Sequence, residues 1–317
     1  MVELFGEVKI NWLGKRKIFF GITAVLILLG AISLVRHGTF NYGVDFKGGT
    51  IMDVHFQDKP DVERIRTTLQ GGGAGDATIQ ELTNVNNEIL IEVEGKDQAE
   101  ASQGREVITR ALDRNYAGKY DVRSAESVGP KVGADLRHQA VMATLYALGG
   151  MLVYIAFRFE WIYGAAAVFA ALHDTLMTLG LFSLFNREIN LTVIAALLTL
   201  IGYSMNDTIV VFDRVRENLK QRRRDTLGTV MNDSINQTLS RTILTSGLTF
   251  MTVLALFIFG GEVINHFAFA MVVGIIVGTY SSIAIASPLV LIYTNMRDRA
   301  VARQVVPVRV AKAPREK

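Results

Sequence analysis

Residues 18–35 read IFFGITAVLILLGAISLV, a run in which no side chain carries a charge. One helical crossing of a bilayer needs about 20 predominantly apolar residues, and this run reaches that length with its flanks. Lys15, Arg16 and Lys17 precede it, as basic residues precede the apolar part of a signal peptide. No small-x-small cleavage pattern follows the run before Arg36, so we expect residues 18–36 to be a retained transmembrane helix.

Five further stretches are long and apolar enough to cross a bilayer. They lie at about 139–157, 162–185, 189–212 and 242–259, and within 263–296. The chain has 317 residues, 50% of them hydrophobic and 20% charged, with a mean hydropathy of +0.29. This balance is typical of a membrane protein that carries one substantial soluble domain. We therefore predict a multi-pass α-helical membrane protein with six transmembrane helices.

The loops that connect these stretches differ in positive charge. Lys and Arg gather before the first crossing, after the fourth and after the sixth, whereas the short loops after the third and fifth crossings hold only Arg187. Because short loops rich in Lys and Arg stay on the cytoplasmic side, both termini are expected in the cytoplasm. The predicted division is a cytoplasmic arm (1–17), the first helix (18–36), a periplasmic domain (37–133), helices two to six with a cytoplasmic loop near 214–238 (134–296), and a basic cytoplasmic tail (297–317).

The segment between the first two crossings has the pattern of a small α+β domain. Strands are expected at 50–56, 77–82, 88–93 and 120–124, with helices at 61–69 and after Asp97, which is placed to cap the second one. The order β-α-β-β-α-β predicts a ferredoxin-like sheet with both helices on one face. Gly48 and Gly49, before the first strand, indicate a tight turn or a close backbone approach.

Ionisable residues inside the apolar stretches are the candidates for function, because each costs about 2.5–3.5 kcal/mol to insert at the centre of a helix. Asp207 lies within GYSMNDTIVVF (202–212), and Arg241 lies at the start of the fifth stretch. Residue 224, in the most polar part of the connecting loop, is midway between them. If two antiparallel helices turn there, both residues lie about 25 Å from the turn, and we expect them to pair.

Other polar residues in the apolar stretches have two interpretations each. Thr238, Thr242, Thr245, Thr249 and Thr252 recur at helical spacing around Arg241 and either line an ion path or serve helix packing. Ser204, Asn206, Thr245 and Thr249 are the polar lining candidates. His173 and Asp174, in the third stretch, either relay protons or hydrogen-bond a neighbouring helix.

The absence of cysteine excludes a disulfide framework, thiolate metal ligands and a thiol nucleophile. We see no nucleophile–base pair and no metal-ligand cluster in the sequence, and expect a protein that is not an enzyme and needs no cofactor or metal.

Four motifs resemble signatures of the SecD/SecF family, and among its members those of the SecF type. VDFKGGT (44–50) resembles its phenylalanine–glycine–glycine signature, ESVGP (126–130) its motif before the second span, LHD (172–174) its third-span motif and GYSMNDTIVVFDRVREN (202–218) its fourth-span signature. The resemblance covers nearly the whole chain apart from the basic tail.

The resemblance implies pairing with SecD in a twelve-span complex of the resistance–nodulation–division superfamily, in the bacterial inner membrane. It also implies association with the SecYEG channel and YajC, and use of the proton or sodium gradient to promote export of unfolded preprotein after the SecYEG/SecA-driven stage. In the family, a fourth-span aspartate and a fifth-span arginine belong to the ion-conducting site. They map onto Asp207 and Arg241.

Two alternatives stay open. One is half of a proton-coupled small-molecule exporter of the same superfamily. The outer domain argues against it, because it is single and small and leaves no room for a second, substrate-binding subdomain. The other is a purely structural translocon subunit, whose charges only hold the helices together.

Overall fold

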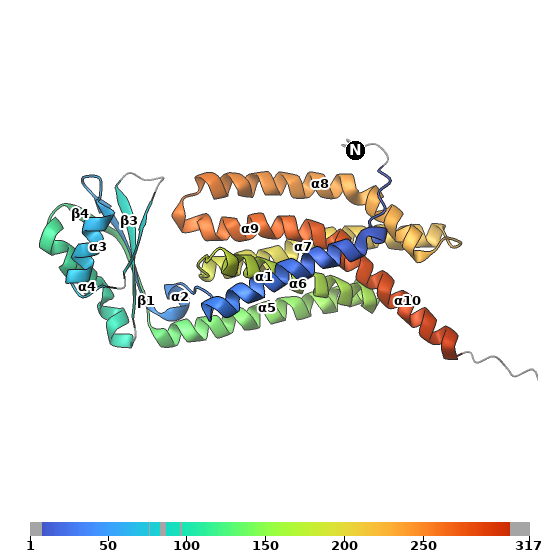
Figure 1. The fold of residues 1–317 in the computed structure, drawn as a ribbon, viewed down its shortest axis with the longest axis horizontal. Coiled ribbons are helices and arrows are strands. Elements are labelled where there is room, and N and C mark those ends of the chain that lie inside the picture. Colours follow the sequence, from blue (N-terminus) through green and yellow to red (C-terminus); the bar gives the residue numbers. More distant parts are fainter. Residues whose placement is uncertain (1–7, 76, 83–86, 96, 305–317) are drawn as a thin grey trace, which may run out of the picture.

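The computed structural model describes residues 8–75, 77–82, 87–95 and 97–304. Residues 1–7 of the predicted arm and 305–317 of the predicted tail therefore lie outside the described residues. Figure 1 shows a long helical bundle with a small sheet domain at one end. The described arm and the end of the last helix lie at the opposite end.

Among the described residues, six helical segments are long and apolar enough to cross a membrane. They comprise α1 (Arg16–His37), α5 (Pro130–Arg158), α6 (Trp161–Leu184), α7 (Leu191–Gln221), α8 (Leu227–Phe259) and a last segment built from three pieces. In that segment α9 (Glu262–Ser281) passes through a π-helical turn, η2 (Ser282–Ala286), into α10 (Ser287–Gln304). A 3-10 turn, η1 (Leu13–Lys15), leads into α1.

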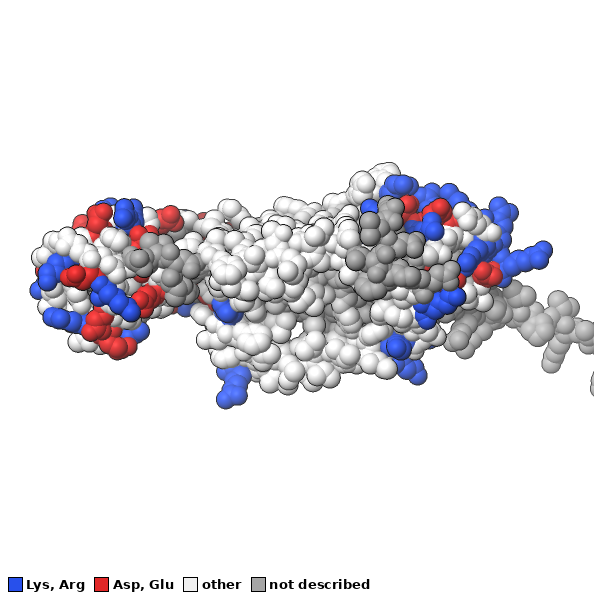
Figure 2. Space-filling model, turned by 90° about the horizontal axis from the view of Figure 1, so that it is seen from above, with Lys and Arg blue, Asp and Glu red and all other residues white. Residues whose placement is uncertain are grey.

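The surface of the bundle has the distribution of side chains that a lipid environment requires. Large apolar residues such as Val35 on α1, Phe157 on α5 and Leu248 on α8 are 82%, 91% and 66% exposed. Figure 2 shows this part of the molecule as a band almost free of charge, between the charged sheet domain and a charged opposite end. The predicted six-helix membrane architecture is confirmed.

The predicted loop at 214–238 is a helical hairpin instead. α7 continues to Gln221 and α8 begins at Leu227, so that only residues 222–226 connect them. The reason is an apolar stripe that continues beyond the membrane crossing on both helices. Val215 and Met231 are fully buried and Ile235 is 1% exposed, all in one core cluster of the bundle. Charged residues occupy only the outward faces.

The sheet domain has the predicted topology. Its strands are β1 (Gly49–Phe56), β2 (Thr78–Glu81), β3 (Glu88–Glu94) and β4 (Tyr120–Val128), in the spatial order β2-β3-β1-β4 with antiparallel pairing throughout. Helices α3 (Val62–Gly71) and α4 (Gln98–Tyr116) cover one face. Alternate residues of β1, from Met52 to Phe56, form a single core with Ile65 of α3 and Ile108 of α4. Asp97 caps α4 as expected, accepting from the Glu100 N–H at 2.7 Å.

The elements α2 (Val44–Lys47), β1 and α5 meet where the sheet domain joins the bundle. The one-turn helix α2 lies between α1 and β1, and α5 starts directly after β4 with Pro130 in its first turn. Gly48 has a φ of +93°, and a Cβ there would lie 2.7 Å from the Cα of Pro130. At Gly49, with a φ of +150°, a Cβ would collide with the carbonyl oxygen of Val93 on β3. The two glycines thus permit the close backbone approach that the sequence predicted.

Candidate functional site

Asp207 lies near the middle of α7, in the part of the bundle with the apolar surface. Its side chain is 3% exposed, and its Oδ2 accepts a hydrogen bond from the Ser246 hydroxyl of α8 at 2.7 Å. Ser246 is the hydrogen-bond partner that the described part of the chain provides for this carboxyl group. A buried carboxylate with one hydroxyl donor leaves most of its acceptor capacity unused.

Arg241 is at the same depth as Asp207, but the expected ion pair is not formed. Asp207 precedes the end of α7 by 14 residues, and Arg241 follows the start of α8 by 14 residues. Among the described residues no ion pair includes Arg241, and its side chain is exposed. The prediction of a direct pair within this chain is therefore wrong.

The cause is the rotation of α8 about its own axis. Thr238, Thr242 and Ser246 recur every four residues and are buried, so this row faces the bundle. Arg241 and Thr245 lie in the adjacent row, offset by one residue or about 100°, and are exposed, while Thr249 in the same row is half-buried. Ser246 was missed as a site residue, although its spacing from Thr238 and Thr242 was a usable signal.

The lining candidates fall into two groups. Ser204 is buried, whereas Asn206 on α7 is exposed beside the row of Arg241. The hydroxyls of Thr245 and Thr249 donate to carbonyls of their own helix, those of Arg241 and Thr245, at 3.0 and 3.1 Å. Thr245 also offers its carbonyl oxygen to the Tyr203 hydroxyl of α7 at 3.2 Å. Asn206, Arg241 and Thr245 therefore place polar groups on the outer surface at a depth where lipid would otherwise lie.

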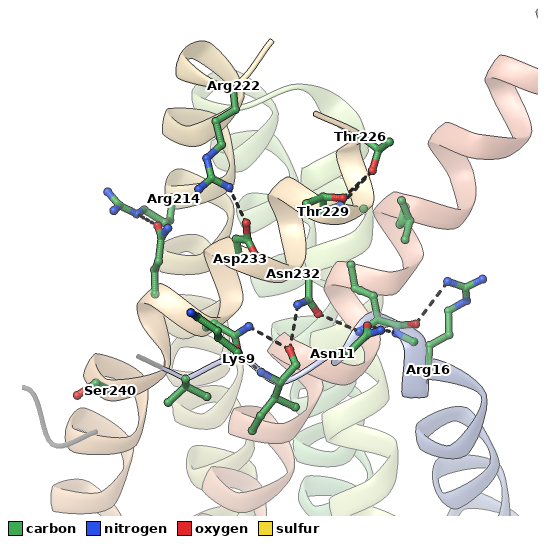
Figure 3. A pocket seen from close by; sticks show the side chains of 18 residues that line it. Lys9, Asn11, Arg16, Arg214, Arg222, Thr226, Thr229, Asn232, Asp233 and Ser240 are labelled. Atoms are coloured by element: carbon green, nitrogen blue, oxygen red, sulfur yellow. Dashed lines mark hydrogen bonds and ion pairs between the residues drawn. The ribbon is translucent and has the colours of Figure 1, made fainter. Parts of the chain in front are cut away.

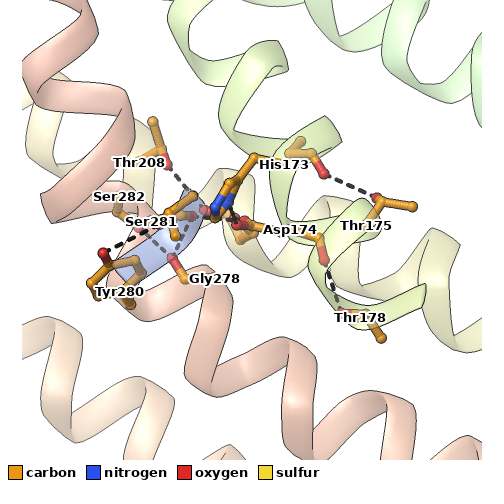
Figure 4. Close-up of polar contacts among 12 residues, drawn as sticks. His173, Asp174, Thr175, Thr178, Thr208, Gly278, Tyr280, Ser281 and Ser282 are labelled. Atoms are coloured by element: carbon orange, nitrogen blue, oxygen red, sulfur yellow. Dashed lines mark hydrogen bonds and ion pairs between the residues drawn. The ribbon is translucent and has the colours of Figure 1, made fainter. Parts of the chain in front are cut away.

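His173 and Asp174 form a second polar cluster, which joins three helices. The carboxylate Oδ2 of Asp174 accepts from the Ser204 hydroxyl of α7 at 2.5 Å and from the Ser281 hydroxyl of α9 at 2.7 Å. Its Oδ1 lies 2.9 Å from Nδ1 of His173. Figure 4 shows His173, Asp174 and Ser281 converging between the helices, next to Ser282 at the start of the π-helical turn. Of the two interpretations, hydrogen bonding to neighbouring helices is the one that the contacts display.

The Asp174 cluster lies close to Asp207 along α7. Ser204 is one turn before Asp207, and its carbonyl oxygen accepts from the Thr208 hydroxyl at 3.3 Å. Both His173 and Asp174 are 5% exposed, and Nε2 of His173 has no hydrogen-bond partner among the described residues. Ser281 was not predicted, since serines in a charge-free run, here Ser281 and Ser282, are also usual in helix packing. No group of three or more His, Asp or Glu residues in the described ranges could hold a metal ion.

A cavity of about 990 Å³ lies at the end of the bundle opposite the sheet domain. In it the arm is held by two asparagines of α8. Asn232 donates to the Ile10 carbonyl at 2.9 Å and accepts from the Trp12 N–H at 2.8 Å, while Asn236 accepts from the Trp12 indole N–H at 2.8 Å.

Two of the cationic side chains that line this cavity form ion pairs. Figure 3 shows Arg222 directed toward Asp233, at 2.5 Å, and Arg214 pairs with Glu217 at 2.6 Å. These exposed ion pairs form the solvated surface network that is usual at helix ends. The cavity is therefore a binding place for the arm, and the candidate site remains in the middle of the bundle.

Comparison with known proteins agrees with this fold. The model of the family described as "Protein export membrane protein SecD/SecF, C-terminal" matches residues 108–296, and that of the "SecD/SecF GG Motif" matches residues 39–59. The second match contains α2 and the two glycines at the junction. The first contains Asp174, Asp207 and Arg241.

Relatives match over nearly their whole length. The translocase subunit SecF of Calditerrivibrio nitroreducens is 47% identical, over 92% of this chain and 96% of the relative. SecF of Escherichia coli O157:H7 is 40% identical, over 90% and 88% respectively. The crystal structure of SecDF from Thermus thermophilus superposes with a TM-score of 0.78 at 40% identity, covering 91% of this chain and 39% of that longer one.

A bundle of six membrane-spanning helices with one ferredoxin-like domain defines the class as a multi-pass membrane protein with a single small α+β domain. The chain belongs to the SecD/SecF family of protein export membrane proteins, and its full-length similarity is to the translocase subunit SecF.

Proposed function

We propose that this chain pairs with a SecD partner and uses a transmembrane ion gradient to promote protein export, with Asp207 and Arg241 in the ion path. The observation that carries the proposal is the position of these two groups. One is a buried carboxylate with a single hydroxyl donor, and the other is an arginine at the same depth, exposed on a polar face. Charged residues at such depth mark ion pathways by default.

The gradient supplies energy through the charge that moves. Each elementary charge that crosses a potential of 100 mV yields about 2.3 kcal/mol. Useful work requires that the ion shift the balance between two conformations. Protonation of Asp207 would weaken its acceptance from Ser246, which links α7 to α8. We propose that α8 then shifts against α7, and that Arg241 exchanges partners in the SecD half.

His173 and Asp174 enter the proposal as a possible relay. The link would run from Asp174 through the Ser204 hydroxyl toward the turn of α7 that carries Asp207. The orphan Nε2 of His173 is the atom at which a proton would be exchanged. The path through Asp207 and Arg241 is proposed for either coupling ion, proton or sodium.

The test is export and ion flux in vesicles that contain the SecD-paired complex. Asp207→Asn is expected to abolish both gradient-driven activities while the complex still assembles, and Arg241→Met is expected to do the same. Asp213→Asn is the matched control, since Asp213 lies on the same helix but is exposed, 3.8 Å from Arg158. Gradient-stimulated export that survives in a well-assembled Asp207→Asn complex would leave the purely structural subunit as the better account.

We further propose a bacterial inner-membrane location with both termini in the cytoplasm and the sheet domain in the periplasm, where it would meet unfolded preprotein beside SecYEG and YajC. The support is the crowding of Lys and Arg at the end away from the sheet domain. A cysteine introduced at Gln98 should react with an impermeant thiol reagent in cells with a permeabilised outer membrane, and one at Arg223 should not. The reverse labelling pattern would overturn the orientation.

The small-molecule exporter has no specific observation in its favour. Its substrate would need a binding subdomain outside the membrane, whereas the described outer part is one sheet with two helices.

A further inference from the structure

The one-turn helix α2 (Val44–Lys47) contacts the start of the helix that carries Asp207. Asp45 Oδ2 accepts a hydrogen bond from the Leu191 N–H, the first residue of α7, at 2.8 Å. A carboxylate at a helix N-terminus satisfies a free N–H and interacts favourably with the helix dipole. Asp45 thus supplements the regular cap of α7, Asn190, which accepts from the Val193 N–H at 3.1 Å.

Two further contacts attach the residues just before α2 to the connection that leads into α7. The Gly43 N–H donates to the Ile189 carbonyl at 2.9 Å, and the Ile189 N–H donates to the Asn41 carbonyl at 2.8 Å. The ring of Phe46 is 4% exposed and packs in one core cluster with Ile189 and Val193. Polar and apolar contacts together make α2 follow the outer end of α7.

The other side of α2 is attached to the sheet domain. Lys47 Nζ lies 2.5 Å from Glu94 Oε1 on β3, and the Gly48 carbonyl accepts from the Gly95 N–H at 3.2 Å. β1 starts at the next residue, Gly49, which pairs with Glu94 on one side and Val128 on the other. A displacement of α2 therefore reaches both neighbours of the central strand.

α7 is not directly connected to the sheet domain along the chain, because α5 and α6 lie between them in the sequence. We propose that α2 is the coupling element between the ion site and the outer domain, and that Asp45 is a positioning residue in it. It transmits displacement of α7 to β1 and β3 without taking part in ion conduction. This inference rests on the proposed function, because it gives the route by which movement at Asp207 reaches the domain that would act on preprotein.

The test measures ion flux and export in the same SecD-paired vesicles. Asp45→Ala removes the oxygen that holds Leu191, and we expect export to fall at least fivefold while ion flux persists. Asp45→Asn keeps an acceptor oxygen in place, so it should restore part of the export and should not block ion conduction. Asp97→Ala is the matched control, since it removes a comparable helix cap inside the sheet domain and should change neither activity.

The ion pair between Lys47 and Glu94 provides an independent test in case the Asp45→Ala complex does not assemble. Lys47→Glu alone should reduce export, and Glu94→Lys added to it should restore export by reversing the pair. Wild-type export in assembled Asp45→Ala, equal loss of flux and export, or no restoration by the reversed pair would each overturn the coupling role. These results are distinct from failure of the proposed function itself, which appears as gradient-driven export in Asp207→Asn.

Discussion

Two buried carboxylates lie in the middle of the bundle, and their surroundings suit different tasks. Asp174 accepts from Ser204 and Ser281 and contacts His173, so its charge is stabilised by donors from three helices. Asp207 accepts from Ser246 alone among the described residues. Protonation of Asp174 would disturb three contacts, whereas protonation of Asp207 disturbs one. Asp174 thus links α6, α7 and α9, whereas Asp207 keeps acceptor capacity that the described residues do not use.

A third carboxylate, Glu188, lies outside the membrane-spanning segments, in the connection between α6 and α7. Burial raises the pKa of Glu188 to about 7, and the negative charges of Glu92 and Asp45 add to this effect, while Lys47 opposes it. Burial also raises the pKa of Glu92 on β3, with a further contribution from Asp45. The cavity of about 200 Å³ beside these groups is also lined by Arg187 and His266. Acidic groups of α2, β3 and the α6–α7 connection thus meet at the junction.

This arrangement predicts that the junction between the sheet domain and the bundle is more stable in mild acid than at higher pH. The folded-state pKa of Glu188 lies above its usual value of 4.5, so its stabilising contribution is present below about pH 4.5 and is lost as the pH rises through about 7. Glu188→Gln should therefore raise the thermal stability of the complex at pH 8, by on the order of 1 kcal/mol after solvent screening, and by much less at pH 5. Thermal unfolding of both proteins across this range is the measurement, and Glu81→Gln on β2 is the control. An equal shift at both pH values would contradict the prediction.

At the residue scale, the sequence predicted how deep Asp207 and Arg241 lie in the bundle better than it predicted which way their side chains face. Equal distances from a turn at residue 224 placed Asp207 and Arg241 at one level, and the hairpin has that geometry. Which row of α8 faces α7 depends on a rotation of about 100° per residue, and both rows contain polar residues at the same spacing. The choice of Ser246 over Arg241 as the partner of Asp207 is therefore settled by packing of the whole bundle.

At the scale of elements, long periodic segments were predictable and short ones were not. Charge content alone suggested a loop for 214–238, yet Val215, Met231 and Ile235 continue the buried stripe and keep both helices intact. Conversely, the four-residue helix α2 has too few residues to display a period, and only Gly48 and Gly49 hinted at a special backbone.

The π-helical turn at Ser282–Ala286 is the least predictable element. Its sequence, SIAIA, is apolar and small, and continues the run of α9 without any breaking residue. All five of its residues are buried, next to the Ser281 that donates to Asp174. Single π-helical turns inside α-helices are frequent at functional sites. The nearest mark in the local sequence is Pro288, which has no N–H to donate to the carbonyl of Ala284 within the turn.

At the scale of the molecule, polar groups lie on the outside of the bundle at membrane depth. A chain surrounded only by lipid would leave these groups without polar partners. Thr199, Gly202 and Asn206 form an exposed stripe of small and polar residues on α7, and the adjoining Tyr203 donates to the carbonyl of Thr245, in the row of Arg241 on α8, at 3.2 Å. Small and polar residues are typical of helix–helix interfaces in membranes. The face that α7 and α8 present is therefore the one that we expect the SecD half to cover.

This face leads to a prediction for the chain expressed without SecD. An uncovered arginine at mid-membrane costs about 2.5–3.5 kcal/mol on insertion scales, and lipid cannot satisfy the polar groups of Asn206 either. We expect the lone chain to be degraded several times faster than the same chain beside SecD, as measured by pulse–chase in a strain that lacks the partner. Asn206→Leu combined with Arg241→Leu should lengthen the lifetime of the lone chain, because it removes the groups that need cover. The same double variant should lose ion flux in the paired complex, whereas Leu248→Ala, on the apolar part of α8, should alter neither property. A lone chain that purifies as a stable, monodisperse species with wild-type Asn206 and Arg241 would show that this face needs no partner.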